Sequence, residues 1–123
     1  MPGQASPYYL ANKDSNVRTV ELTADVEAGY AIGYNGGYAI AGAQMQGIAR
    51  SDGKSGEFIG VTTSNTASAI VGAAVTNGAA LAIGNGGKLV PAAAGNFIVA
   101  RALDDSDPDL FITVEIKPEA IQQ

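Results

Sequence analysis

The chain has 123 residues, the length of one ordinary domain and enough to bury a core without disulfides or metal ions. Seven basic residues stand against 12 acidic ones, giving a net charge of −5, and the basic residues are scattered along the sequence. This distribution argues against nucleic acid or an anionic membrane as the partner, because both need cations that converge on one surface.

The residues that carry the commonest enzyme chemistry are missing. The sequence contains no cysteine and no histidine, so the usual thiol nucleophile and the usual general base are absent. It also has no Gly-x-Ser-x-Gly elbow and no complete Gly-x-x-x-x-Gly-Lys-Ser or Gly-x-x-x-x-Gly-Lys-Thr loop for phosphate. We therefore expect no enzyme activity, no catalytic residues, no metal site and no other cofactor.

Residues 1–16 are expected to form an extended N-terminal arm. The arm contains Pro7 followed by three large side chains, Tyr8, Tyr9 and Leu10, among polar residues and turn formers. A segment of this composition cannot bury enough apolar surface to order itself, so these four residues are candidates for contact with a partner. The arm lacks the basic start and apolar core of a signal peptide, which predicts a protein made in the cytoplasm.

Residues 17–118 are expected to form one all-β domain, either a compact β-sandwich or a small β-barrel. Residues 110–117 alternate between apolar and mixed side chains, which is the period of a half-buried strand. Gly-containing pairs such as Asn35-Gly36 and Asn85-Gly86 supply the residues that tight hairpins need. Residues 64–75 are the most ambiguous and could hold a short helix. The predicted strands are 17–24, 28–34, 37–43, 45–50, 57–63, 69–75, 79–84, 87–91, 97–103 and 110–117.

The sequence also repeats itself, which predicts two pseudo-repeated units at about 28–63 and 79–117. Three blocks match in the same order, at offsets of 50, 51 and 53 residues, as small loop insertions would produce. The matched blocks are 33–40 with 83–90, 47–50 with 98–101, and 57–61 with 110–114. Chance matches between Gly- and Ala-rich strands are the alternative explanation. The tail at 119–123 receives no role.

Two clusters admit a functional and a structural interpretation. The acidic loop at 104–109 could bind a cation through its carboxylates, although its spacing does not fit an EF-hand, or it could be a solvated connection. Tyr30, Tyr34 and Tyr38 recur every four residues and would share one face of a hairpin. They could form an aromatic platform for a ligand such as a sugar, or serve packing. In both cases the structural interpretation is favoured.

Residues 26–116 resemble the phage head decoration, or capsid cement, proteins. That family shows a Gly-containing hairpin, a Gly-Ile-Ala strand, a short turn with another strand, a Gly-Asn-Gly-Gly segment ending in proline, an apolar-x-x-Ala-x-Ala strand, and a final alternating strand. The corresponding residues here are 29–37, 47–49, 55–61, 84–91, 97–102 and 110–116. The resemblance covers about three-quarters of the chain and rests on small and apolar residues rather than on rare motifs.

The resemblance implies a structural role at the outer surface of a virion. A decoration protein is a compact β domain, commonly a homotrimer, that binds the major capsid protein and stabilises the shell, with an N-terminal arm that reaches onto the shell. Two alternatives stay open. The chain could be a carbohydrate-binding β module that uses its tyrosines, or another virion component such as a tail or fibre domain.

Overall fold

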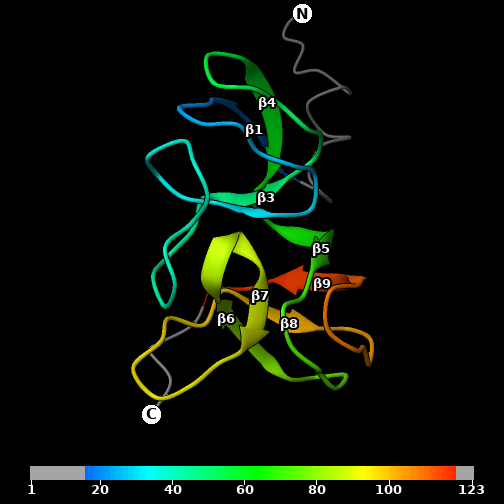
Figure 1. The fold of residues 1–123 in the computed structure, drawn as a ribbon. Coiled ribbons are helices and arrows are strands. Elements are labelled where there is room, and N and C mark those ends of the chain that lie inside the picture. Colours follow the sequence, from blue (N-terminus) through cyan, green and yellow to red (C-terminus); the bar gives the residue numbers. More distant parts are fainter. Residues whose placement is uncertain (1–15, 119–123) are drawn as a thin grey trace, which may run out of the picture.

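The computed structural model describes residues 16–118, and within them the chain is almost entirely β (Figure 1). Nine strands form there, and the one helical element is a single 3-10 turn, which confirms the all-β prediction. No helix in this part of the chain is long and apolar enough to cross a membrane. The elements are β1 (Val17–Glu21), β2 (Ala31–Ile32), β3 (Gly47–Ala49), β4 (Phe58–Thr62), β5 (Asn65–Ile70), β6 (Ala80–Ile83), η1 (Asn85–Gly87), β7 (Leu89–Pro91), β8 (Ala100–Ala102) and β9 (Phe111–Ile116).

The strands form two antiparallel sheets, with the order β1-β4-β3-β2 in the first and β5-β9-β8-β6-β7 in the second. Figure 1 shows the first sheet above the second. Each sheet curls strongly, so that its two edges approach each other. An isolated backbone hydrogen bond joins the edges, from Thr23 to Gly36 in the first sheet and from Gly72 to Leu89 in the second. These single bonds do not close a ladder. The structure therefore supports the sandwich alternative, and the small β-barrel is wrong for residues 16–118.

The two sheets repeat one arrangement of strands. Strands β1, β4, β3 and β2 follow the same order as β5, β9, β8 and β6, and β7 is an added edge strand in the second sheet. We call residues 16–63 the first unit and residues 64–118 the second unit. In the first unit Val20 pairs with Ile59, and in the second Ala69 pairs with Ile112. The reciprocal backbone bonds outside the strands recur too, between Val26 and Gly53 and between Val75 and Ser106.

The hydrogen-bond register fixes which residues correspond. Positions in β1 correspond to positions 49 residues later, and positions in β3 and β4 to positions 53 residues later. The sequence blocks gave an offset of 51 for the β3 segment, so that match was shifted by two residues. Gly47 corresponds to Ala100 because Gly47 pairs with Ile32 and Ala100 pairs with Leu81. Sequence similarity alone placed Gly47 opposite Ile98, since both begin a similar tetrapeptide.

Two predicted strands differ from the structure. Residues 37–43 form turns with an isolated bridge between Tyr38 and Ile32, because glycines on either side direct the chain into tight turns. The strand predicted at 69–75 instead begins at Asn65, whose positive φ of 63° marks the turn out of β4. The short helix considered for residues 64–75 is therefore wrong. Every other predicted strand contains an observed strand that is the same length or shorter.

Each unit has its own core, and the core of the second unit extends into the first. The alternating burial of β9 places Ile112, Val114 and Ile116 inside. The first core consists of Val20, Leu22, Val26, Ile32, Ala49, Ile59 and Val61. The second core takes Ala31, Ala39, Met45 and Ile48 from the first unit and packs them against residues that include Leu81, Leu89 and Val114. The junction between the units is therefore a packed apolar contact rather than a linker.

Candidate functional site

The contact residues expected from the sequence, Pro7, Tyr8, Tyr9 and Leu10, lie outside the described residues, as do residues 119–123. Their role stays a prediction. The described chain begins just before β1, an edge strand of the first sheet. Residue 16, where the described chain begins, therefore lies next to an edge of that sheet.

The acidic loop uses a carboxylate to hold a neighbouring turn. Asp105 Oδ1 accepts a hydrogen bond of 2.7 Å from the backbone N–H of Asn77. Asp52, which corresponds to Asp105 in the first unit, accepts one of 2.8 Å from the N–H of Ala28. The same bond at the same place in both units identifies it as part of the fold. It supports the structural interpretation of the loop at 104–109.

The last carboxylate of the loop has a different partner. Asp109 Oδ1 lies 2.8 Å from Lys88 Nζ, and this hydrogen bond raises the pKa of the Lys88 ammonium. Within residues 16–118, no group of three or more acidic side chains is arranged to hold a metal ion. The carboxylates of this loop therefore point to separate partners.

The three tyrosines do not share one face. The rings of Tyr30 and Tyr38 stack with centroids 5.1 Å apart, and Tyr38 packs against the first core. Burial raises the pKa of the Tyr38 phenol, although a hydrogen bond to the backbone of Glu27 opposes this in part. Tyr34 lies apart and is 70% exposed. The expected common face is wrong, because residues 33–37 form a tight turn that separates Tyr34 from the other two.

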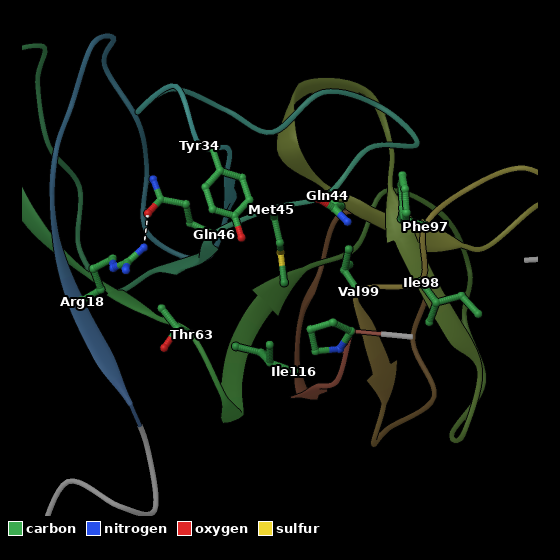
Figure 2. Close-up of a pocket in the computed structure, with 11 residues that line it drawn as sticks. Arg18, Tyr34, Gln44, Met45, Gln46, Thr63, Phe97, Ile98, Val99 and Ile116 are labelled. Atoms are coloured by element: carbon green, nitrogen blue, oxygen red, sulfur yellow. Dashed lines mark hydrogen bonds between the residues drawn. The ribbon is translucent and has the colours of Figure 1, made fainter. Parts of the chain in front are cut away.

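The two units meet at a cleft of about 360 Å³ (Figure 2). We call it the inter-unit cleft. Figure 2 shows Arg18 on β1 at one side and Phe97 at the other, with Met45 between them. The full lining is Arg18, Tyr34, Gln44, Met45, Gln46, Thr63, Phe97, Ile98, Val99, Ile116 and Pro118.

The chemistry of the inter-unit cleft suits a peptide segment. Its floor is apolar, since Met45, Val99 and Ile116 are buried core residues. Its rim carries amide and hydroxyl groups, and Arg18 donates a hydrogen bond of 3.3 Å to Gln46 Oε1. A pocket that combines an apolar floor with a few polar groups can bind one or two side chains together with the backbone beside them. The part of the lining that the described residues form contains no carboxylate.

Sequence analysis did not identify the cleft. Gln44 and Gln46 flank a core methionine two residues apart, as alternating rim and floor positions would, but the same pattern occurs in any half-buried segment. Phe97 and Ile98 come from the other unit, about 50 residues away. Only the stacking of the two units brings these segments together.

The matches among solved structures include a phage protein. The protein superposes on the crystal structure of the head fiber gp8.5 N base of bacteriophage phi29 with a TM-score of 0.72. The match covers 89% of this chain and 99% of that chain, at 18% sequence identity. The two proteins share one fold. No protein-family model matches the chain, and no curated protein matches it in sequence.

The extent of the match shows that the shared fold includes both units. Each unit holds about half of the described residues, so a match over 89% of the chain cannot come from one unit alone. The arrangement of the two units therefore belongs to the common fold. At this level of identity the similarity says nothing further about individual side chains.

Proposed function

We propose that this protein is a non-enzymatic structural component of a phage virion that binds the outer surface of the capsid shell and stabilises it. The observation that carries the proposal is the fold shared with a phage head fiber base over nearly the whole chain. The resemblance of residues 26–116 to capsid decoration proteins supports the same role. Its proposed partner is the major capsid protein.

The physical character of the domain suits this role. A cement protein needs a rigid body, small residues that permit close contact, and many identical weak contacts that act together. The two packed cores supply a rigid body. A protein of this kind performs no chemical step, so it does not need histidine or cysteine, which the sequence lacks. These features favour a structural role over an enzymatic one.

The N-terminal arm is the proposed anchor. Its backbone would add to a sheet edge of a capsid subunit while Tyr8, Tyr9 and Leu10 fill pockets there. Pro7 would fix the direction in which the arm leaves. The inter-unit cleft offers the shell a second contact. It begins beside Arg18, close to the point where the arm joins β1.

We further propose that the protein is a homo-oligomer, with a trimer favoured, made in the host cytoplasm and assembled onto the virion. A multivalent particle gains affinity because its arms bind neighbouring capsid subunits together. The large apolar side chains that the described residues expose are Val17, Tyr34, Ile40, Phe58, Leu103, Leu110 and Phe111. So many exposed apolar groups on a small domain favour contact with other proteins.

Co-sedimentation with undecorated capsids tests the proposal. The full chain is expected to pellet with capsids at a fixed ratio to the shell protein, whereas a chain lacking residues 2–13 should stay in the supernatant. The truncated protein should keep its fold, because residues 16–118 contain both cores. Circular dichroism and solution mass check this point before the binding assay.

A substitution series separates the arm's side chains from its length. Replacing Tyr8, Tyr9 and Leu10 together by serine should abolish co-sedimentation, and replacing Gln4 and Ser6 by alanine should leave it unchanged. Unchanged binding of the truncated chain would show that the arm is not the anchor. If the full-length chain does not bind capsids at all, the proposed function itself is contradicted.

The base of a head fiber is the second candidate, and the structural match is the observation that favours it. Both candidates place the domain on a phage head, but a fiber base carries a longer polypeptide. Mass spectrometry of purified virions separates them. A decoration protein would be found as the 123-residue chain, and a fiber base as part of a longer one.

A further inference from the structure

The contact between the two units of one chain has a defined geometry. At the junction the ring of Phe111, on β9, lies against Gly29 so closely that a Cβ at position 29 would collide with it. The backbone N–H of Ile70, on β5, donates a hydrogen bond of 3.0 Å to the carbonyl oxygen of Gly29. Gly29 has a positive φ of 86° and is buried. The junction thus joins an edge of the second unit to a glycine turn of the first.

Because the two units repeat, both halves of this contact occur a second time. Phe58 corresponds to Phe111, since Phe58 pairs with Glu21 on β1 as Phe111 pairs with Ile70 on β5. Gly78 corresponds to Gly29, with a positive φ of 89°, and its N–H bonds to Ala102 as that of Gly29 bonds to Ala49. The second set has no partner within the described chain. A Cβ at Gly78 would meet no atom within 4 Å, and Phe58 is 66% exposed, compared with 56% for Phe111.

The backbone groups of the second set are correctly placed for the same hydrogen bond. In an antiparallel pair, alternate residues point their N–H groups toward and away from the partner strand. The backbone N–H of Leu22 donates to the carbonyl oxygen of Glu57, next to β4, and so points toward the partner strand. The N–H of the preceding residue, Glu21, therefore points away from β4, as the N–H of Ile70 points away from β9. The carbonyl of Gly78 accepts a bond of 3.2 Å from Arg101 and keeps a second lone pair for another donor.

Two buried apolar positions of the internal junction have charged counterparts in the repeat. Ile48 and Ile70 are buried at the junction within the chain. Their counterparts in the repeat are Arg101 and Glu21, which carry opposite charges. The lining of the internal junction includes Thr62 and Ala67, which correspond to Glu115 and Arg18. The internal junction itself carries one charged side chain, Arg50, and Arg18 already lines the inter-unit cleft of its own chain.

The structure assigns these two surfaces to each other in different copies of the chain. We propose that the edge of the first unit, with Glu21 and Phe58, binds the Gly78 turn of a second copy, as the edge of the second unit binds the Gly29 turn within one chain. Figure 1 shows β1 and β4 at one end of the molecule and the loop between β5 and β6 at the other, so one chain cannot join its own two surfaces. Such a head-to-tail contact closes into a ring when its rotation permits. It gives the proposed homo-oligomer its interface and does not depend on binding to a capsid.

Substitution of Phe58 tests the interface in the absence of capsids. The full chain is expected to show a mass that is a multiple of 12.4 kDa by sedimentation velocity. Phe58→Glu should weaken association about tenfold or more, because it removes an aromatic side chain from the contact and puts a charge in its place. Ile40→Glu is the matched control. Ile40 is equally exposed, at 69%, but lies on neither surface, and its mass should not change. An unchanged mass for Phe58→Glu would exclude this surface.

Crosslinking tests the pairing of the two surfaces directly, because the chain has no cysteine of its own. Ser68 and Ala28 both line the internal junction, and Thr19 and Asn77 are their counterparts at the unpartnered surfaces. With a short bismaleimide, Ser68→Cys/Ala28→Cys should crosslink within one chain. Thr19→Cys/Asn77→Cys should instead give covalent oligomers on a denaturing gel.

The results that would overturn the proposal are distinct. A monomeric full chain up to millimolar concentration, with no intermolecular crosslink, would mean that the two surfaces do not bind each other. If residues 1–15 cover Phe58 instead, the full chain stays monomeric and its mass rises when residues 2–13 are removed. Loss of capsid binding with an intact ring would count against the proposed function and leave this interface standing.

Discussion

Gly47→Ala is expected to reduce the free energy of unfolding by about 3 kcal/mol, a large part of the total stability of a domain of this size. Gly47 is the first residue of β3 and is fully buried. A Cβ there would collide with the carbonyl oxygen of Thr62 and lie 2.8 Å from Val61 Cγ1. Both neighbours are themselves buried in β4, so neither can move away cheaply. Chemical denaturation followed by circular dichroism measures the effect.

A second glycine provides the matched control. Gly37 also has a negative φ, and the atom nearest to a Cβ there is the side chain of Ala24 at 3.7 Å, an ordinary contact. Gly37→Ala is therefore expected to change the stability by less than about 1 kcal/mol. Equal losses for the two variants would mean that the tight approach of β4 to β3 is not what requires glycine at position 47.

The sequence predicted the fold where a local pattern determines it. The alternation of side-chain types at 110–117 predicted a strand, and β9 forms there with exposed and buried residues alternating along its whole length. The Asn-Gly pairs at 35–36 and 85–86 produced turns, because a positive φ at glycine is decided within a few residues. The internal similarity of the two halves was visible as well. These features depend on side-chain period and backbone freedom, which a single sequence displays.

Features that depend on contacts between distant segments were not predictable. The inter-unit cleft joins Arg18 and Gln46 to Phe97, and no local pattern encodes how the two units stack. The correspondence of Gly47 with Ala100 was missed by two residues, because hydrogen bonds rather than sequence similarity set a strand register. Phe58 is proposed as a contact residue only because its counterpart Phe111 lies against Gly29 at the junction, which the sequence does not show.

Leu81→Ala and Ile32→Ala are each expected to cost about 3 kcal/mol and to lower the unfolding midpoint by roughly 10 °C. The two residues occupy corresponding positions in the two units, and both are fully buried. Leu81 belongs to the second core and Ile32 to the first. Because Met45 and Ile48 of the first unit are part of the second core, loss of either core removes packing from the other unit. We therefore expect each variant to unfold in a single transition, not one unit at a time.

Two optical signals distinguish a single transition from independent unfolding of the units. All five tyrosines lie within residues 8–38 and the chain has no tryptophan, so tyrosine fluorescence reports on the first unit and the arm. Circular dichroism reports on the strands of both units. If the junction couples the units, the two signals coincide in Leu81→Ala as they do in Ile32→Ala. If the units unfold separately, circular dichroism in Leu81→Ala changes at a lower temperature than the fluorescence, because the weakened unit contains no tyrosine. That separation would contradict the packed junction on which the shared rigidity of the domain depends.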